Sequence, residues 1–106
     1  MRSWKQFARS LLFSMPTVLC VHVSADTLNV DLADGRSIAV PVEWYPRLAN
    51  GSEAERNNWR FIGRGEGIHW PDLDEDVSVE NLLTGARSGE SQKSFKQWLE
   101  SRAHAT

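Results

Sequence analysis

The chain has only one cysteine, Cys20, in 106 residues. It therefore forms no internal disulfide, and it lacks the paired cysteines of a structural zinc site. Charge of one sign is also missing: 12 basic and 14 acidic residues give a formal net charge of −2. Such a balance provides no general attraction to nucleic acid or to an anionic membrane. The hydrophobic share of 41% suits a single soluble globular domain.

No apolar run is long enough to cross a bilayer, because the run 11–23 is interrupted by polar residues and a proline. Basic residues precede this run, and Val23–Ala25 resembles a small-residue cleavage site. Residues 1–25 therefore resemble a secretory signal.

A second interpretation makes the same segment structural. Apolar residues at helical spacing from Trp4 to Met15 predict a helix that Pro16 ends, and residues 17–24 alternate as a strand. The apolar side of this strand is expected to consist of Leu19, Val21 and Val23. Cleavage after Ala25 would delete the strand, so we favour a cytoplasmic protein, with a secreted protein as the alternative.

The clearest local structure is a β-hairpin over residues 27–42, with its turn at Asp34-Gly35. A two-residue turn would put the apolar faces of the two strands on opposite sides. A three-residue loop pairs Val30 with Ile38 and makes one continuous apolar face. We therefore predict the longer loop, with Gly35 in the left-handed conformation.

Two short helices are predicted after the hairpin. Pro46 can begin a helical turn through Leu48, since its fixed φ suits the first helical position. Ser52 and Glu55 have the spacing of a capping box, which predicts a second helix that ends near Trp59.

Two short strands, near 59–63 and 67–70, frame a glycine-rich segment. The alternate glycines from Gly63 to Gly67 predict a bulge or a close crossing of backbones. Their spacing is not that of a dinucleotide-binding loop. Pro71 ends the second strand.

Two further helices complete the chain. Ser78 is predicted to cap a short helix that Gly85 ends. After a small-residue linker, residues 91–103 form an amphipathic helix. We expect it to dock through Phe95 and Leu99, because a helix of this length is marginally stable alone in water.

Together these elements predict an α+β fold. Its antiparallel sheet combines hairpin 27–42 with short strands near 17–24, 59–63 and 67–70, and it packs with two or three short helices and the C-terminal amphipathic helix. The predicted domain boundaries are a leader or extra N-terminal helix at 1–19, a single α+β domain at 20–85, and a linker and helix at 86–106.

The strings VDLADGRSIAVPVEWYPRL and ERNNWRFIGRGEGIHWPDLDEDVSVENLLTG are long and compositionally unusual. They resemble the bacterial family called domain of unknown function 2442, over roughly residues 21–85. The resemblance implies a small α+β cytoplasmic protein without assigned catalytic residues. Relatives often occur beside a gene for another small protein, of domain of unknown function 4160, which implies an antitoxin-like or regulatory role. Some relatives carry a helix-turn-helix extension, for which the residues after Gly85 are too few.

The acidic block after Pro71 resembles part of a calcium-binding loop. Asp72, Asp74 and Asp76 have the spacing of the first three ligands of an EF-hand, but Val77 and Leu83 replace the required glycine and glutamate. The block is therefore not an EF-hand.

A looser metal site remains the alternative, because His69 and Asp72 could converge across the proline turn, with Asp74 beside them. Such a site would make the chain a cryptic metal-dependent enzyme. No nucleophile stands in a recognisable motif, and His69 is the only candidate base of the central region. We therefore predict no catalytic residue, no cofactor and no enzymatic activity.

The favoured hypothesis is a small protein-binding adaptor or regulator, antitoxin-like, whose partner is another small protein that is encoded next door. Acidic residues beside aromatic side chains suit a basic partner, since complementary charge steers association and aromatic rings anchor it. No membrane contact is expected, nucleic-acid binding is not expected without a partner, and the oligomeric state is left open. The predicted binding residues are Trp44, Tyr45, Arg47, His69, Trp70, Asp72, Asp74 and Asp76.

Overall fold

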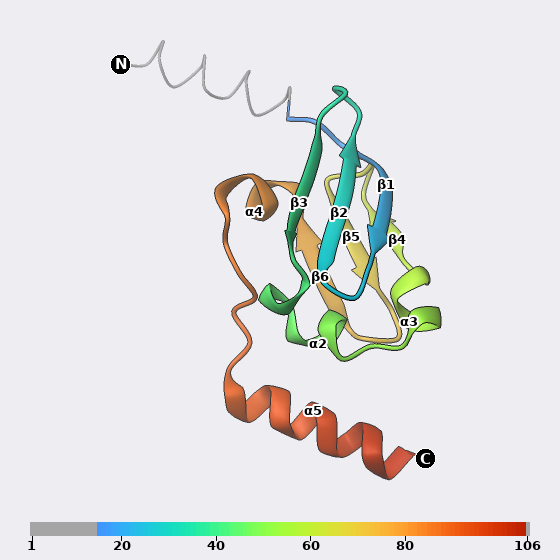
Figure 1. Ribbon diagram of the computed structural model, residues 1–106, viewed down its shortest axis with the longest axis vertical. Coiled ribbons are helices and arrows are strands. Elements are labelled where there is room, and N and C mark those ends of the chain that lie inside the picture. The colour runs from blue at the N-terminus through green and yellow to red at the C-terminus, as the bar shows by residue number, and fades with distance from the viewer. Residues whose placement is uncertain (1–14, 106) are drawn as a thin grey trace.

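The computed structural model describes residues 15–105, which form two three-stranded antiparallel sheets and several short helices (Figure 1). The α+β class is confirmed, but the strands form two sheets rather than the expected one. The first sheet has the order β1-β2-β3, with β1 at Val18–Val23, β2 at Thr27–Leu32 and β3 at Ser37–Pro41. The second has the order β4-β5-β6, with β4 at Arg60–Ile62, β5 at Gly67–Trp70 and β6 at Glu75–Ser78.

The helices lie at the ends of the sheets and after them. They are a 3-10 turn at Val42–Trp44, α2 at Pro46–Ala49, α3 at Glu53–Asn57, α4 at Val79–Thr84 and α5 at Gln92–Ala105. The helix expected from Trp4 falls, apart from Met15, outside the described residues. Among residues 15–105, no helix is long and apolar enough to cross a membrane.

Both predicted N-caps are confirmed. The Ser52 hydroxyl accepts a hydrogen bond from the Glu55 amide at 3.1 Å, and the Glu55 carboxylate accepts one from the Ser52 amide at 2.8 Å. The Ser78 hydroxyl caps α4 by accepting from the Asn81 amide at 3.0 Å, and Gly85 ends this helix with φ +80°. These short-range bonds satisfy amides that the first turn of a helix leaves unpaired.

The hairpin has the predicted register, because Val30 lies opposite Ile38 and Leu28 lies opposite Val40. Gly35 has φ +96°, as the three-residue loop requires. Pro41 ends β3, an edge strand, where its missing amide leaves no ladder bond unmade.

Strand β1 departs from the predicted alternation. A bulge between Val18 and Cys20 inserts an extra residue into its pairing with β2. The bulge points Leu19 outward, where its side chain is 60% exposed, and Val18 takes the core position at 3%. The prediction that Leu19 joins Val21 and Val23 in the core is therefore wrong, because alternation fails across a bulge.

The two sheets face each other across one apolar core. Every buried hydrophobic residue of the described chain lies between Val18 and Leu82. Trp70 is the largest fully buried side chain, and its indole Nε1 donates to the Arg56 carbonyl at 3.0 Å. Burial of an indole needs such an acceptor, so this bond fixes α3 over the core.

The predicted close crossing of backbones occurs at Gly65. Its carbonyl accepts a hydrogen bond from the Val18 amide at 2.8 Å, which joins the β4–β5 turn to the start of β1. A Cβ at Gly65 would lie 3.2 Å from the Val18 nitrogen, and φ is +105°. Only glycine meets both conditions without strain.

Candidate functional site

The predicted binding residues divide into buried and exposed ones. Trp70 is fully buried, and Tyr45 is 3% exposed. Both side chains therefore stabilise the fold and present no ring to a partner. Trp44 and Arg47 are partly buried.

The acidic block does not form one surface. Glu75 and Asp76 lie in β6, a strand that the sequence did not predict, so Asp76 stands across from His69. The Asp76 carboxylate lies 2.5 Å from the His69 Nδ1. Asp72 instead accepts from the Asn58 side-chain amide at 2.9 Å, and Asp74, with φ +51°, leaves its carboxylate 88% exposed beside Arg47.

The proposed metal cluster of His69, Asp72 and Asp74 is not assembled. His69 contacts Asp76 rather than Asp72, because β5 and β6 pair directly and Pro71 directs Asp72 toward α3. Within residues 15–105, no three histidine, cysteine, aspartate or glutamate side chains converge as metal ligands. The prediction that His69 and Asp72 converge is therefore wrong.

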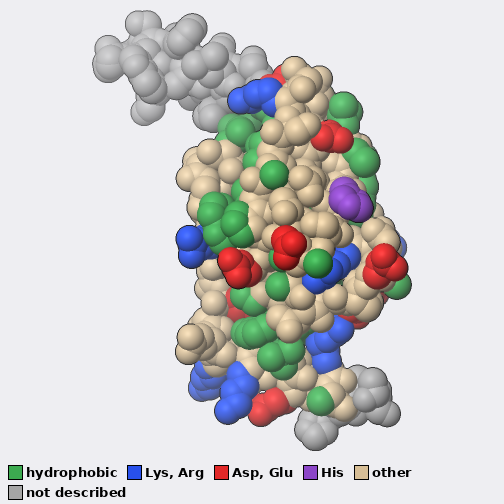
Figure 2. All heavy atoms as spheres, viewed as in Figure 1, with side chains coloured by type: hydrophobic (Ala, Val, Ile, Leu, Met, Phe, Trp, Pro, Cys, Tyr) green, Lys and Arg blue, Asp and Glu red, His purple; other side chains and the backbone are tan. Residues whose placement is uncertain are grey.

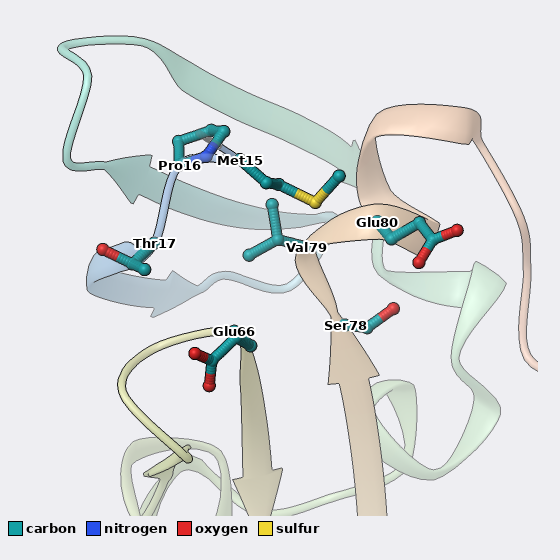
Figure 3. A pocket seen from close by; sticks show the side chains of 7 residues that line it. All are labelled: Met15, Pro16, Thr17, Glu66, Ser78, Val79 and Glu80. Atoms are coloured by element: carbon teal, nitrogen blue, oxygen red, sulfur yellow. The ribbon is translucent and has the colours of Figure 1, made fainter. Parts of the chain in front are cut away.

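A pocket of about 420 Å³ lies where Met15–Thr17, Glu66 and residues 78–80 meet (Figure 3). Figure 3 shows the carboxylates of Glu66 and Glu80 pointing away from each other. The Glu66 carboxylate also accepts from the Arg64 amide at 2.8 Å. The pocket thus has no paired carboxylates for acid–base chemistry.

Arg47, in α2, makes polar contacts with two other segments of the chain. Its Nε donates to the Glu90 Oε1 at 3.0 Å, and its Nη2 donates to the Glu90 Oε2 at 2.5 Å. Its Nη1 donates to the Leu73 carbonyl at 3.3 Å and lies 3.7 Å from the Asp74 carboxylate. The guanidinium also lies 5.2 Å from the centroid of the Trp98 ring. Arg47 thus joins the loop before β6 to the C-terminal tail, defined as residues 86–105.

The tail is held from its first residues. The Tyr45 hydroxyl donates to the Ala86 carbonyl at 3.1 Å, and the Ser88 amide donates to the Trp44 carbonyl at 3.1 Å. The Arg87 guanidinium stacks over the Trp44 ring at 4.9 Å. The residues of the WYPR string therefore bind the chain's own tail.

Helix α5 docks through Trp98 and Arg102. Arg102 donates two hydrogen bonds to the Glu55 carboxylate, at 2.8 and 3.0 Å, and stacks over Trp98 at 4.6 Å. Phe95 is partly buried and stacks on Trp98, whereas Leu99 is 38% exposed. Docking is confirmed, but the prediction that Leu99 mediates it is wrong. The side of α5 that contacts the domain carries Trp98 and Arg102, and it leaves Leu99 exposed. We call Trp44, Tyr45, Arg47, Glu55 and Asp74 the tail-docking face.

Both ion pairs shift the pKa of their carboxylates. Hydrogen bonds from Arg102 and from the Ser52 amide lower the pKa of Glu55 to about 2. Hydrogen bonding to Arg47 lowers the pKa of Glu90, and in return the pKa of Arg47 is raised. The charged forms are thus favoured at neutral pH.

Glu75 lies behind the face, on the same side of β6 as the core. Burial raises its pKa to about 7, and the negative charge of Glu90 adds to this, while Arg47 opposes it. Its Oε2 is buried and has no hydrogen-bond partner among the described residues. The other oxygen, Oε1, accepts a hydrogen bond from the Asp76 amide at 3.2 Å. A buried carboxylate oxygen without a partner destabilises the charged form of the carboxyl.

The model of a protein family, described as Protein of unknown function (DUF2442), matches residues 18–88. The chain belongs to this family. The match confirms the resemblance inferred from the two sequence strings. It stops at the start of the tail, so α5 lies beyond the part that the family model describes. No curated protein is detectably similar to the chain.

Two solved structures share the fold. A protein of unknown function from Rhodospirillum rubrum is 26% identical, with a TM-score of 0.61, over 73% of this chain and 95% of its own. An uncharacterised protein from Chromobacterium violaceum is 19% identical, with a TM-score of 0.64, over 92% of this chain and 89% of its own. The Rhodospirillum rubrum protein therefore matches this chain over nearly its whole length, whereas about a quarter of this chain has no counterpart in it.

Sequence reasoning missed several residues of the site, namely Glu55 and Glu75 in the domain and Glu90, Trp98 and Arg102 in the tail. The sequence did contain a signal for Trp98 and Arg102, because their spacing of four residues places them on the same face of the predicted helix. Glu90 had none, since it lies 43 residues from Arg47 in a linker of small residues.

Proposed function

We propose that this protein is a small protein-binding adaptor or regulator, whose partner contacts the tail-docking face. The observation that carries the proposal is the Arg47 site, where one guanidinium joins a carboxylate, an indole ring and two carbonyl groups. Arginine beside aromatic residues is typical of residues that anchor protein complexes. Among the described residues no three side chains converge as metal ligands, so no observation favours the metal-enzyme alternative.

As partner we propose the small protein of domain of unknown function 4160 that the family resemblance implies, in an antitoxin-like pair. Co-expression of the two full-length proteins and size-exclusion chromatography test this. We expect co-elution, and an affinity at least about tenfold lower for Arg47→Glu, because a buried charge would be reversed. Arg36→Glu is the matched control, since Arg36 lies in the exposed hairpin turn with Asp34. Failure of the unmodified proteins to associate would exclude this partner.

We propose a cytoplasmic location for the same protein. Strand β1 supports it, because Val18, Val21 and Val23 contribute to the core and would be lost by cleavage after Ala25. Intact-mass analysis of the protein, purified from its natural host, should find β1 retained. A mature protein that starts at Asp26 would contradict the proposal.

A further inference from the structure

The tail is attached to the domain by side-chain contacts and contributes little to the core. From Ala86 to Ala103, no residue is buried. Among the described hydrophobic side chains of the tail, Trp98 alone packs against the core cluster, and it is partly buried. Figure 1 shows α5 below the domain, at the end of an extended linker, and Figure 2 shows basic side chains exposed over it. The core is therefore built almost entirely from residues that precede the tail.

The tail-docking face remains organised by contacts within the domain. The Leu73 carbonyl and Asp74 hold the Arg47 guanidinium, and the Ser52 amide holds the Glu55 carboxylate. Neither set of contacts uses the tail. A preorganised site binds a ligand without paying the entropy of ordering these side chains.

The contacts define what the face selects. Arg47 binds a carboxylate through two parallel hydrogen bonds, one to each carboxylate oxygen, and its guanidinium stacks on an indole. Glu55 binds the guanidinium of Arg102. This group lies one helical turn after the Trp98 indole, since the two residues are four positions apart. The selected ligand is an amphipathic helix with an acidic residue before its first turn, followed by an aromatic residue and then an arginine.

We infer that the tail-docking face is a binding site for a partner helix of this pattern, and that α5 is its internal competitor. The inference rests on the proposed function and adds the chemistry of the partner and its regulation. Residues tied to the domain by a short linker compete at an effective concentration of about the millimolar range. A partner helix therefore binds weakly while α5 is docked, and binds tightly once α5 is released.

A synthetic peptide with the sequence of residues 88–105, fluorescently labelled, tests the inference against full-length chains. The tail-weakened chain carries Glu90→Ala, Trp98→Ala and Arg102→Ala. We expect it to bind the peptide at least about tenfold more tightly than the unmodified chain, because its competitor is weakened. Adding Arg47→Gln should abolish this gain, and a scrambled peptide should not bind.

Two results would overturn the inference: equal peptide binding by the unmodified and tail-weakened chains, or a gain that persists with Arg47→Gln. Thermal melts establish that each variant is folded. The neighbouring small protein separates the two proposals. If it binds the unmodified and tail-weakened chains with equal affinity, α5 is not a competitor, although the proposed function stands. If it binds neither chain while the peptide behaves as expected, the proposed partner is wrong and the helix-binding site stands.

Discussion

The guanidinium of Arg47 and the carboxylate of Glu90 form a two-point ion pair between residues 43 positions apart. Their side chains are only 16% and 9% exposed. The pair is therefore shielded from solvent, unlike the Arg36–Asp34 pair of the hairpin turn, where the corresponding fractions are 59% and 38%. A shielded, bidentate pair contributes more to stability than an exposed one.

A double-mutant cycle with Arg47→Gln and Glu90→Gln should reveal this coupling. We expect an interaction free energy of about 1–2 kcal/mol, from urea unfolding of the two single variants and the double variant. The same cycle with Arg36→Gln and Asp34→Asn should give about 0.5 kcal/mol or less. Equal coupling in the two cycles would mean that Glu90 is solvated in solution and that the tail is undocked.

Much of the local structure was predictable, because it depends on residues close together in the sequence. The Ser52–Glu55 capping box, the Ser78 cap and the register around Gly35 are each fixed within a few residues. The division of the strands into two sheets was not predictable. Alternation along a strand shows which face is apolar, but it does not show which strands pair with each other.

The bulge in β1 is a second feature that alternation could not reveal, and it is testable by two substitutions. Val18→Ala should lower the free energy of unfolding by about 2 kcal/mol, because it leaves a cavity in the core. The neighbouring substitution Leu19→Ala should change the free energy of unfolding by at most about 0.5 kcal/mol, since Leu19 is 60% exposed. Chemical denaturation of both variants checks this. A larger loss of stability for Leu19→Ala than for Val18→Ala would mean that Leu19 is in the core and that β1 has no bulge.

Gly65 should not tolerate a side chain. Gly65→Ala should cost about 1–3 kcal/mol, because φ is +105° and the new methyl group would press on the Val18 backbone. Gly89→Ala is the matched control, since a Cβ there meets nothing within 4 Å. Differential scanning calorimetry compares the two. A Gly65→Ala protein as stable as Gly89→Ala would show that the β4–β5 turn does not press on β1.

The site was less predictable than the fold. Aromatic and charged residues gather in the WYPR string and the acidic block, which is why both were predicted to bind a partner. In the structure, Tyr45 and Trp70 are buried. The acidic residues contact different neighbours instead of forming one surface. Alternation could not show that β6 begins at Glu75, because the strand has four residues and starts with two acidic ones. Its consequence, a partly buried carboxyl group on the core side of β6, was therefore missed.

Glu75 should make the protein less stable as the pH rises. Its pKa is raised by burial from 4.5 to about 7, so the folded state binds more protons than the unfolded state between these values. The free energy of unfolding therefore falls as the pH rises through this window, and the penalty is complete above it. Glu75→Gln mimics the protonated form. It should be more stable than the unmodified chain at about pH 8, and the difference should vanish near about pH 5. Urea unfolding at the two pH values measures this, and Glu43→Gln, at an exposed position, controls for the loss of one negative charge. A difference that does not depend on pH would mean that the Glu75 carboxylate is hydrated in the folded protein.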